Sequence, residues 1–225
     1  AMRPVSQPPK SAAMSAAGFL IGLPLAIYLL SFILCFDAPR YYVRPLFLAA
    51  LPFAFYGLDR IMDEGMAVPA MIALISTSLF VFCMVCHGEL VRRKPHPRHL
   101  TLFYLMLSLG GALGGMFVGL LAPAVFVAYF ELPIGLFLCA LLVVVVLWQE
   151  LRPLWRILLL LALCGYGFRL GEVSKEFVDG YHVVVRNFYS QLRVSEKNDD
   201  LPGPKRVMVH GRINHGEQYL AEEHR

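Results

Sequence analysis

A polar run directly after a hydrophobic segment contains the residue types with the most potential for chemistry. Residues 87–99, HGELVRRKPHPRH, bring together three histidines, one carboxylate and four basic groups. At a membrane surface such a cluster could bind an anionic lipid headgroup or a phosphorylated ligand through charge-assisted hydrogen bonds. A solvated loop that sets membrane orientation is the simpler alternative. The spacing is not that of a closed zinc site, and the candidate residues of this interfacial polar cluster are His87, Glu89, Arg92, Arg93, His96 and His99.

A second candidate is the pattern C-x-x-C-H formed by Cys83, Cys86 and His87, which has the spacing of a c-type haem attachment site. In such a site the two thiols form thioethers and the histidine is an axial ligand. Here, however, both cysteines fall in the last turn of a hydrophobic segment, where free thiols usually behave as small apolar side chains. We therefore expect no haem at this pattern, and no other cofactor or metal ion in this chain.

A third group of residues is a set of glycines within a hydrophobic segment, spaced so that small residues recur four positions apart. Missing side chains let a neighbouring helix approach closely, and this favours helix association in lipid. A dinucleotide-binding loop is excluded because the spacing is not G-x-G-x-x-G and no strand precedes it. The sequence thus predicts a packing face for other membrane subunits or a homo-oligomer, formed by Gly110, Gly111, Gly114, Gly115 and Gly119.

The fourth candidate is an acidic residue, Glu131, which lies between two hydrophobic segments and is flanked by Phe130 and Leu132. An ionisable group at membrane depth is by default a candidate for ion or substrate transfer. A carboxylate in an interfacial turn is the alternative interpretation of the same residue.

The composition of the chain places these residues in a membrane protein. Hydrophobic residues make up 58% of the chain and charged residues only 16%, whereas soluble domains carry about 25% charged residues. Many basic residues lie beside hydrophobic runs, where they commonly set membrane orientation. The net charge of +4 is therefore not interpreted as a nucleic-acid footprint. We expect the lipid bilayer as the partner and a multi-pass location in the inner (plasma) membrane.

Six hydrophobic segments predict an all-α polytopic membrane bundle of about five or six transmembrane helices, since a span needs about 20 apolar residues. The second segment is short and flanked by charges, so whether it spans stays open. The fourth is longer than an untilted helix needs, which indicates tilt or a kink at Pro123. The last two are separated only by QELRP and predict a helical hairpin. The segments are residues 18–36, 42–57, 66–86, 100–130, 132–148 and 154–168.

The character of the sequence changes after the sixth segment. Two runs rich in β-branched and aromatic residues, at 179–194 and 206–220, are separated by turn residues and predict a small C-terminal β-hairpin extension. The predicted organisation is a polar N-terminal tail at 1–17, the transmembrane bundle at 18–170 and a soluble extension at 171–225. We expect the extension to be the start of a truncated domain, because a lone hairpin is marginally stable.

Three stretches of this sequence resemble a family, the membrane-embedded, spermidine synthase-like proteins of bacteria. They are CHGELVRRKPHPRHLTLFYLMLSLGGALGGMFVGLLAPAVF with the following ELP (residues 86–133), VRNFYSQLRV (185–194) and VMVHGRINHGEQYL (207–220). In that family a helical membrane region precedes an aminopropyltransferase-like domain. The resemblance covers the second half of the bundle and the extension.

The resemblance implies a role for the last of these stretches. In the family this stretch looks like the β-hairpin with which the spermidine synthase domain begins. In that hairpin a glycine-containing turn and a glutamine form part of the amine-binding edge. Gly211 and Gly216 match the glycines, but an acidic residue of the soluble enzymes is replaced here by a histidine. Either Gln218 or Asn214 takes the place of the glutamine. The implied candidate substrate-binding residues are His210, His215 and Gln218.

The resemblance also shows what the sequence does not contain. An aminopropyltransferase needs a parallel α/β domain with a glycine-rich loop and an aspartate base, and residues 1–225 hold no such segment. We therefore expect the membrane-anchoring portion of a spermidine synthase-like protein, not catalytic by itself, whose parent is an aminopropyltransferase-like transferase. The alternatives are a transporter or ligand-binding module that acts through Glu131 and the interfacial polar cluster, and a structural subunit that docks through the glycine-rich helix.

Overall fold

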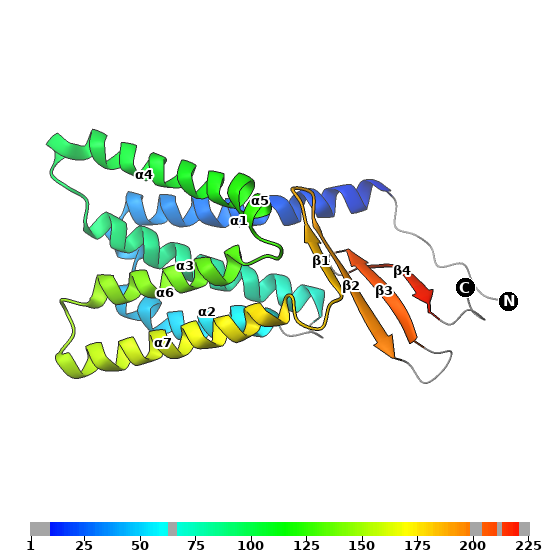
Figure 1. Ribbon diagram of the computed structural model, residues 1–225. Coiled ribbons are helices and arrows are strands. Elements are labelled where there is room, and N and C mark those ends of the chain that lie inside the picture. Colours follow the sequence, from blue (N-terminus) through cyan, green and yellow to red (C-terminus); the bar gives the residue numbers. More distant parts are fainter. Residues whose placement is uncertain (1–9, 63–66, 199–203, 211–212, 221–225) are drawn as a thin grey trace. The chain divides into compact units, whose positions relative to one another are not determined.

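The structure, a computed structural model, describes residues 10–62, 67–198, 204–210 and 213–220. Most of these residues are helical, and a four-stranded antiparallel sheet follows the last helix (Figure 1). This confirms the predicted helical class with β-structure near the C-terminus. The chain divides into two compact units, Ala1–His96 and Pro97–Arg225. The predicted boundaries at 17/18 and 170/171 stay predictions.

The first unit consists of three helices, α1 (Lys10–Asp37), α2 (Arg44–Met62) and α3 (Val68–Arg92). Helix α3 packs against both α1 and α2, and it begins with a proline in its first turn, where the missing N–H costs nothing. A short 3-10 turn, Pro39–Tyr41, joins α1 to α2. The buried side chains between the helices include Cys35, Leu51 and Met84.

Helix α3 is longer than the sequence predicts. The expected end near residue 86 is wrong, because the helix continues to Arg92 and carries the polar residues 87–92. Loss of hydrophobicity does not end a helix when the following residues, such as glutamate, leucine and arginine, are good helix formers. The helix stops shortly before Pro95, whose ring disfavours helical backbone at the residue before it. The interfacial polar cluster is thus split between a helix and the segment after it.

Gly88→Ala is expected to destabilise the first unit by about 1–3 kcal/mol, the usual cost of overpacking. A Cβ atom at Gly88 would overlap the ring of Tyr42. This ring is buried and its hydroxyl is hydrogen-bonded to Glu89, so it cannot move away freely. Thermal unfolding of the purified protein in detergent measures the loss. Gly22→Ala is the control, because a Cβ there meets nothing within 4 Å, and equal stability of the two variants would contradict the prediction.

The second unit begins with α4 (Leu100–Met116), a π-helical turn (Phe117–Leu121) and the short α5 (Ala122–Val125). In the π turn the Ala122 N–H donates to the Phe117 carbonyl, five residues back. The wide turn lies directly before Pro123, whose ring would clash with the carbonyl four residues earlier in a regular helix. The prediction of one helix to residue 130 is wrong, since the backbone becomes extended at Phe126 (φ −97°, ψ 135°).

Helices α6 (Glu131–Leu147) and α7 (Pro153–Glu176) follow, and they pack against each other through a short connection, the helical hairpin that the sequence predicts. Helix α7 ends eight residues later than the expected 168. Its polar last turns still contain good helix formers, and the chain turns away only at Gly180, which has φ +81°. Figure 1 shows the sheet following α7 at the end of the hairpin opposite the α6–α7 connection.

The sheet has the order β1-β2-β3-β4, all antiparallel, so that each strand pairs with the next along the chain. The predicted β-hairpin extension therefore consists of three successive hairpins. In β4 a bulge lies opposite Met208 and Val209, where Gly216 and Asn214 are the register partners and His215 is left between them. The strands are β1 (Val183–Arg186), β2 (Gln191–Asn198), β3 (Pro204–His210) and β4 (Ile213–Tyr219).

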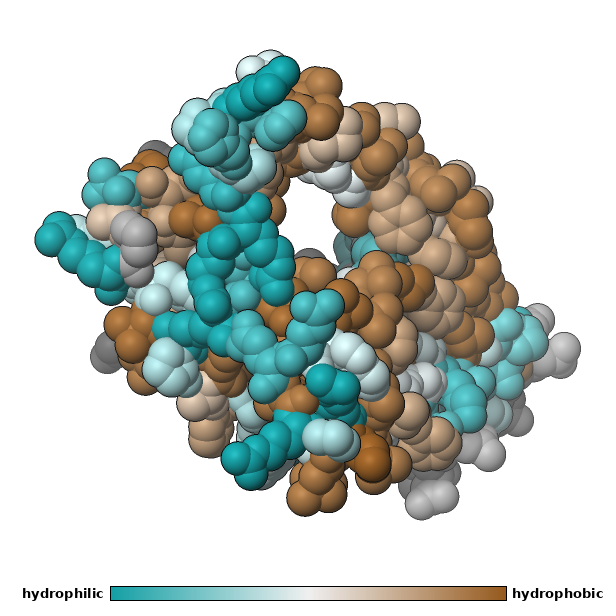
Figure 2. Space-filling view, turned by 90° about the vertical axis from the view of Figure 1, so that its left-hand side faces the viewer, coloured by the Kyte–Doolittle hydropathy of each residue, from teal (hydrophilic) through white to brown (hydrophobic). Residues whose placement is uncertain are grey.

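Three helical runs within the described residues are long and apolar enough to cross a membrane: Val68–Arg92, Pro97–Val125 and Pro153–Glu176. Gly22–Asp37 and α6 are apolar but shorter. Membrane-crossing helices are thus confirmed by length and composition for three of the predicted five or six. Figure 2 shows one face of the molecule, on which hydrophilic side chains gather beside extensive hydrophobic surface.

Candidate functional site

The polar centre of the first unit is the carboxylate of Glu89, in the last turns of α3. Its side chain is only 6% exposed. Oε1 accepts hydrogen bonds from Arg44 Nε (2.6 Å), the Tyr42 hydroxyl (3.1 Å) and Arg92 Nη1 (3.3 Å). Oε2 accepts one from Arg93 Nη1 (3.0 Å). Three arginines and a tyrosine, from the α1–α2 connection, α2 and α3, therefore converge on one carboxylate.

The residues around Glu89 limit the chemistry that its carboxylate can perform. Burial raises the pKa of the Tyr42 hydroxyl well above its usual range, and the adjacent carboxylate adds to the rise. Tyr42 is therefore a permanent hydrogen-bond donor at physiological pH. Because both Glu89 oxygens are occupied by donors, mostly cationic ones, the carboxylate is poorly suited to accept a proton from a substrate. The geometry is that of a hub that joins the end of α3 to the start of α2 and to the α1–α2 connection.

Two residues before Glu89 on the same helix, His87 is buried between α3 and α1. Its Nδ1 lies 3.1 Å from Ser31 Oγ, and that hydroxyl also donates to the Tyr28 carbonyl at 2.9 Å. A serine has one proton to donate, so the His87 Nδ1–H must donate to the serine oxygen. The imidazole also meets the rings of Tyr28 and Phe32 edge-on, with centroids 5.0 and 5.4 Å away. His87 is thus a packed helix-to-helix contact.

The same packing bears on the C-x-x-C-H pattern. Cys83 is buried and His87 is only 5% exposed, with its ring enclosed by two aromatic side chains. A porphyrin with an axial bond to His87 would have to displace these rings, so the residues do not fit a haem in this fold. No group of three or more His, Cys, Asp or Glu side chains among the described residues could hold a metal ion. The absence of any cofactor stays a prediction.

The remaining histidines of the interfacial polar cluster are placed differently. His96 is the last residue of the first unit, and His99 belongs to the second unit at the start of α4. Both side chains are exposed. The structure brings Glu89, Arg92 and Arg93 together, and His87 lies two residues before Glu89 on the same helix.

The polar centre of the second unit is the pair of Glu131 and Arg186. Arg186 Nη1 and Nη2 donate to Glu131 Oε2 and Oε1, both at 2.7 Å, in a two-pronged arrangement. Nη1 also donates to the Ala128 carbonyl at 2.7 Å, and the guanidinium lies 4.3 Å from the centre of the Tyr129 ring. The Arg186 and Glu131 side chains are 5% and 14% exposed. This pair attaches strand β1 to the first turn of α6.

Glu131 is therefore not an isolated acid. Its carboxylate lies at the N-terminus of α6, where the helix dipole also favours a negative charge. The Ala128 carbonyl accepts from Arg186 and from the Phe130 N–H, whereas in a continuous helix it would accept from the N–H four residues on. A carboxylate whose two oxygens are both held by a buried guanidinium is poorly placed to bind a transported cation.

The candidate substrate-binding residues lie on the last two strands. The rings of His210 and His215 are 5.3 Å apart in an edge-on arrangement, because the bulge re-aims His215. Gln218 pairs with Arg206 in the register, about 13 Å along β3 from His210. All three candidate side chains are exposed. The structure joins the two histidines and separates the glutamine from them, and Gly211 lies outside the described residues.

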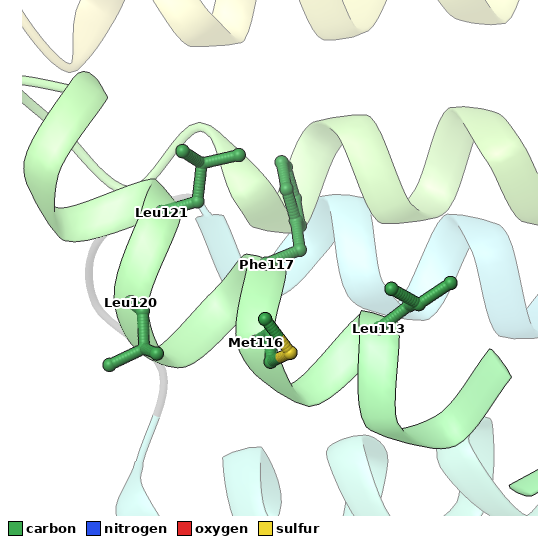
Figure 3. Close-up of a pocket in the computed structure, with 5 residues that line it drawn as sticks. All are labelled: Leu113, Met116, Phe117, Leu120 and Leu121. Carbon is green, nitrogen blue, oxygen red and sulfur yellow. The ribbon is translucent and has the colours of Figure 1, made fainter. Parts of the chain in front are cut away.

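The glycine face is open within the described residues of the second unit: a Cβ atom built on any of the five glycines contacts nothing within 4 Å. Close to these glycines, Leu113, Met116, Phe117, Leu120 and Leu121 line a hollow of about 410 Å³ at the π turn (Figure 3). All five side chains are apolar. The hollow offers no group that could orient or activate a polar substrate.

Several important residues were not found from the sequence. Ser31, Tyr42 and Arg44 contact α3 residues that are more than 40 positions away along the chain. Arg186 gave a weak signal, as a single arginine after the apolar run VVV. A pairwise contact of this kind has no local pattern, so only the folded chain reveals it.

No family model matches this chain, and neither a curated protein nor a solved structure matches it.

Proposed function

We propose that this chain is the membrane-anchoring portion of a spermidine synthase-like protein in the inner membrane. The observation that carries the proposal is the pair of Glu131 and Arg186, which fixes a polar sheet to the end of an apolar helical hairpin. An anchor must hold a water-exposed domain at a defined place beside the bilayer. The sequence resemblance at 86–133, 185–194 and 207–220 supplies the identity of that domain, an aminopropyltransferase-like fold that begins with the sheet.

Five or six spans fit this arrangement better than three. Helix α7 is long and apolar enough to cross, and α6 packs along it through a short connection. The 17 residues of α6 lie at the lower limit for a span. Helix α6 would therefore cross the bilayer beside α7. In the first unit α1 and α2 both pack against α3, so each would cross the bilayer beside it, which gives six crossings.

The transporter hypothesis loses its main support in this geometry. It relied on Glu131 as an ionisable group at membrane depth, and Arg186 already neutralises that group. Amine binding by the sheet is also weakly supported. A cationic amine needs carboxylates, whereas the two residues that the fold brings together at the bulge are histidines.

Membrane extraction is the first experiment. After washing at alkaline pH, which strips peripheral proteins, we expect the chain to stay with the membrane pellet and to be released only by detergent. Release by the wash would overturn the anchor proposal. The spermidine synthase-like identity has a separate test, the coding sequence after Arg225, which we expect to encode an α/β domain with a glycine-rich loop. A stop codon there would remove that identity and leave the anchor.

Gly114→Leu is expected to abolish association with a second copy or another membrane subunit without unfolding the chain. The glycine face of α4 has no neighbour among the described residues of the second unit, so a larger side chain meets no steric conflict within that unit. A partner helix that approaches through small residues would be pushed away. Chemical crosslinking in native membranes measures the association. The control is Gly135→Leu on α6, which also has open space, and unchanged crosslinking in Gly114→Leu would contradict the prediction.

A further inference from the structure

Two aromatic side chains at the tip of the β1–β2 hairpin are almost fully exposed. Phe188 is 71% exposed and Tyr189 is 90% exposed, and their rings meet edge-on with centroids 5.8 Å apart. Large rings in water at a loop tip are unfavourable by themselves, so such a pair indicates a surface that covers it.

The turn that carries these rings is held in place by hydrogen bonds. Asn187 Oδ1 accepts from the backbone N–H groups of Tyr189 and Ser190, both at 3.0 Å. The Asn187 N–H donates to the Ser190 carbonyl, also at 3.0 Å. An asparagine side chain that bonds the backbone two residues on fixes the loop as an Asx turn. The two rings are therefore presented by a preformed turn.

The position of the turn is set by Arg186, the residue directly before it. Arg186 binds Glu131 and the Ala128 carbonyl, at the end of α6 where the apolar helix begins. Phe188 and Tyr189 follow within three residues, so they lie close to the end of α6 at which Arg186 is bound. Figure 1 shows the β1–β2 end of the sheet next to the end of α5 and the beginning of α6. Tyr129 and Val127, in the connection between these helices, are exposed at the same end.

The other end of the α6–α7 hairpin carries the two tryptophans of the chain. Trp148 follows α6 and Trp155 lies in the first turn of α7, and the Arg156 guanidinium lies 5.4 Å from the centre of the Trp148 ring. Tryptophan and tyrosine concentrate at both membrane–water interfaces, and arginine accompanies them. Helix α6 separates the two aromatic ends by about 26 Å, close to the hydrocarbon thickness of about 30 Å.

We infer that the β1–β2 turn is a second membrane anchor, in which Phe188 and Tyr189 insert into the lipid headgroup region at the end of the α6–α7 hairpin. This inference rests on the proposed function, because it needs α6 and α7 to cross the bilayer. The occupant of the exposed surface is the interfacial layer of the lipid. Both rings are apolar, and Tyr189 also has a polar hydroxyl at its tip, so the pair suits the interfacial layer of the lipid. The sheet then lies against the membrane surface and is held there by the turn as well as by Arg186.

Fluorescence quenching by brominated lipids tests this position. A Trp148→Phe/Trp155→Phe background removes both native tryptophans, and Phe188→Trp then places a single emitter in the turn. The control is Lys197→Trp at the far end of β2, an exposed site about 20 Å along the strand. Each variant of the full chain is reconstituted into phosphatidylcholine vesicles whose acyl chains carry bromine near the headgroup or near the chain end. Acrylamide in the buffer reports exposure to water.

We expect bromine near the headgroup to quench the Phe188→Trp variant several-fold more than it quenches the Lys197→Trp variant, and bromine near the chain end to be less effective. Quenching of the Phe188→Trp emission by acrylamide alone, as for the control, would place the turn in water and overturn the inference. Protection of this emission from both quenchers would show that protein covers the turn, and this also overturns it.

Alkaline washing of the same vesicles separates this inference from the proposed function. If the wash removes the chain, the anchor proposal itself fails. If the chain stays in the vesicles but bromine does not quench the Phe188→Trp variant, only the second anchor is wrong.

Discussion

Glu89→Gln is expected to lower the free energy of unfolding of the first unit by about 3 kcal/mol. Removing one partner of a buried ion pair typically costs about 3–5 kcal/mol, because the remaining charge stays buried. The lower end applies here because Arg92 and Arg93 are about half exposed and can be solvated by water. Arg44, at 22% exposure and 2.6 Å from the carboxylate, would suffer most. Thermal unfolding in detergent, followed by near-ultraviolet circular dichroism, measures the effect.

Glu172→Gln provides a matched control for this substitution. Glu172 pairs with Lys175 on the surface of α7, with side chains 45% and 64% exposed. Exposed pairs of this kind contribute little to stability, so this variant should unfold close to the native protein. Equal stability of Glu89→Gln and Glu172→Gln would show that Glu89 is not a hub. The double variant Glu89→Leu/Arg44→Met should recover part of the loss, because neither side chain then leaves a buried charge.

Arg186→Gln is expected to detach the sheet from α6, with a loss of about 3–5 kcal/mol. The substitution leaves the Glu131 carboxylate and the Ala128 carbonyl without their strongest donor in a largely buried place. Limited proteolysis measures the result directly. Cleavage in the connection between α7 and β1 should become many-fold faster in Arg186→Gln, while the membrane part of the chain stays intact. Glu131→Gln should give a similar result, because it removes the other half of the same pair.

Arg206→Gln on the same sheet is the control for this prediction. Arg206 pairs with Glu196 across β2 and β3, with both side chains 44% exposed, so its loss should change proteolysis little. A double-mutant cycle with Arg186 and Glu131 should show strong coupling, because the two side chains share a bidentate contact. Proteolysis of Arg186→Gln at the rate of Arg206→Gln would mean that other contacts hold the sheet.

The elements of the fold could be predicted well where one physical signal dominates. Hydrophobic runs placed α6, the start of α4, the start of α3 and the end of α1 within two residues of their observed positions, because apolar length controls membrane helices, whereas α1 begins at Lys10, eight residues before the predicted start. The ends of helices were less accurate. Helices α3 and α7 continue into polar residues that are good helix formers, and hydrophobicity alone does not detect this.

The candidate sites were predictable as single residues but not as arrangements. The sequence singled out Glu131 as an ionisable group between apolar segments, and Glu89 as a member of the interfacial polar cluster. It could not identify Arg44 or Arg186 as their partners, since a contact over 45 or 55 positions leaves no local pattern. In each case the arginine places the carboxylate in an ion pair, and this changes the function expected of the carboxylate.

By itself the sequence determined that this chain is predominantly hydrophobic and helical, with β-structure near its C-terminus, because these properties follow from composition and local periodicity. The tertiary structure alone decided that Glu89 joins α3 to α2 and to the α1–α2 connection, that Arg186 attaches the sheet to α6, and that the β1–β2 turn exposes Phe188 and Tyr189. The physical reason is that burial and ion pairing depend on contacts between residues that are far apart in the sequence. These contacts form only in the folded chain.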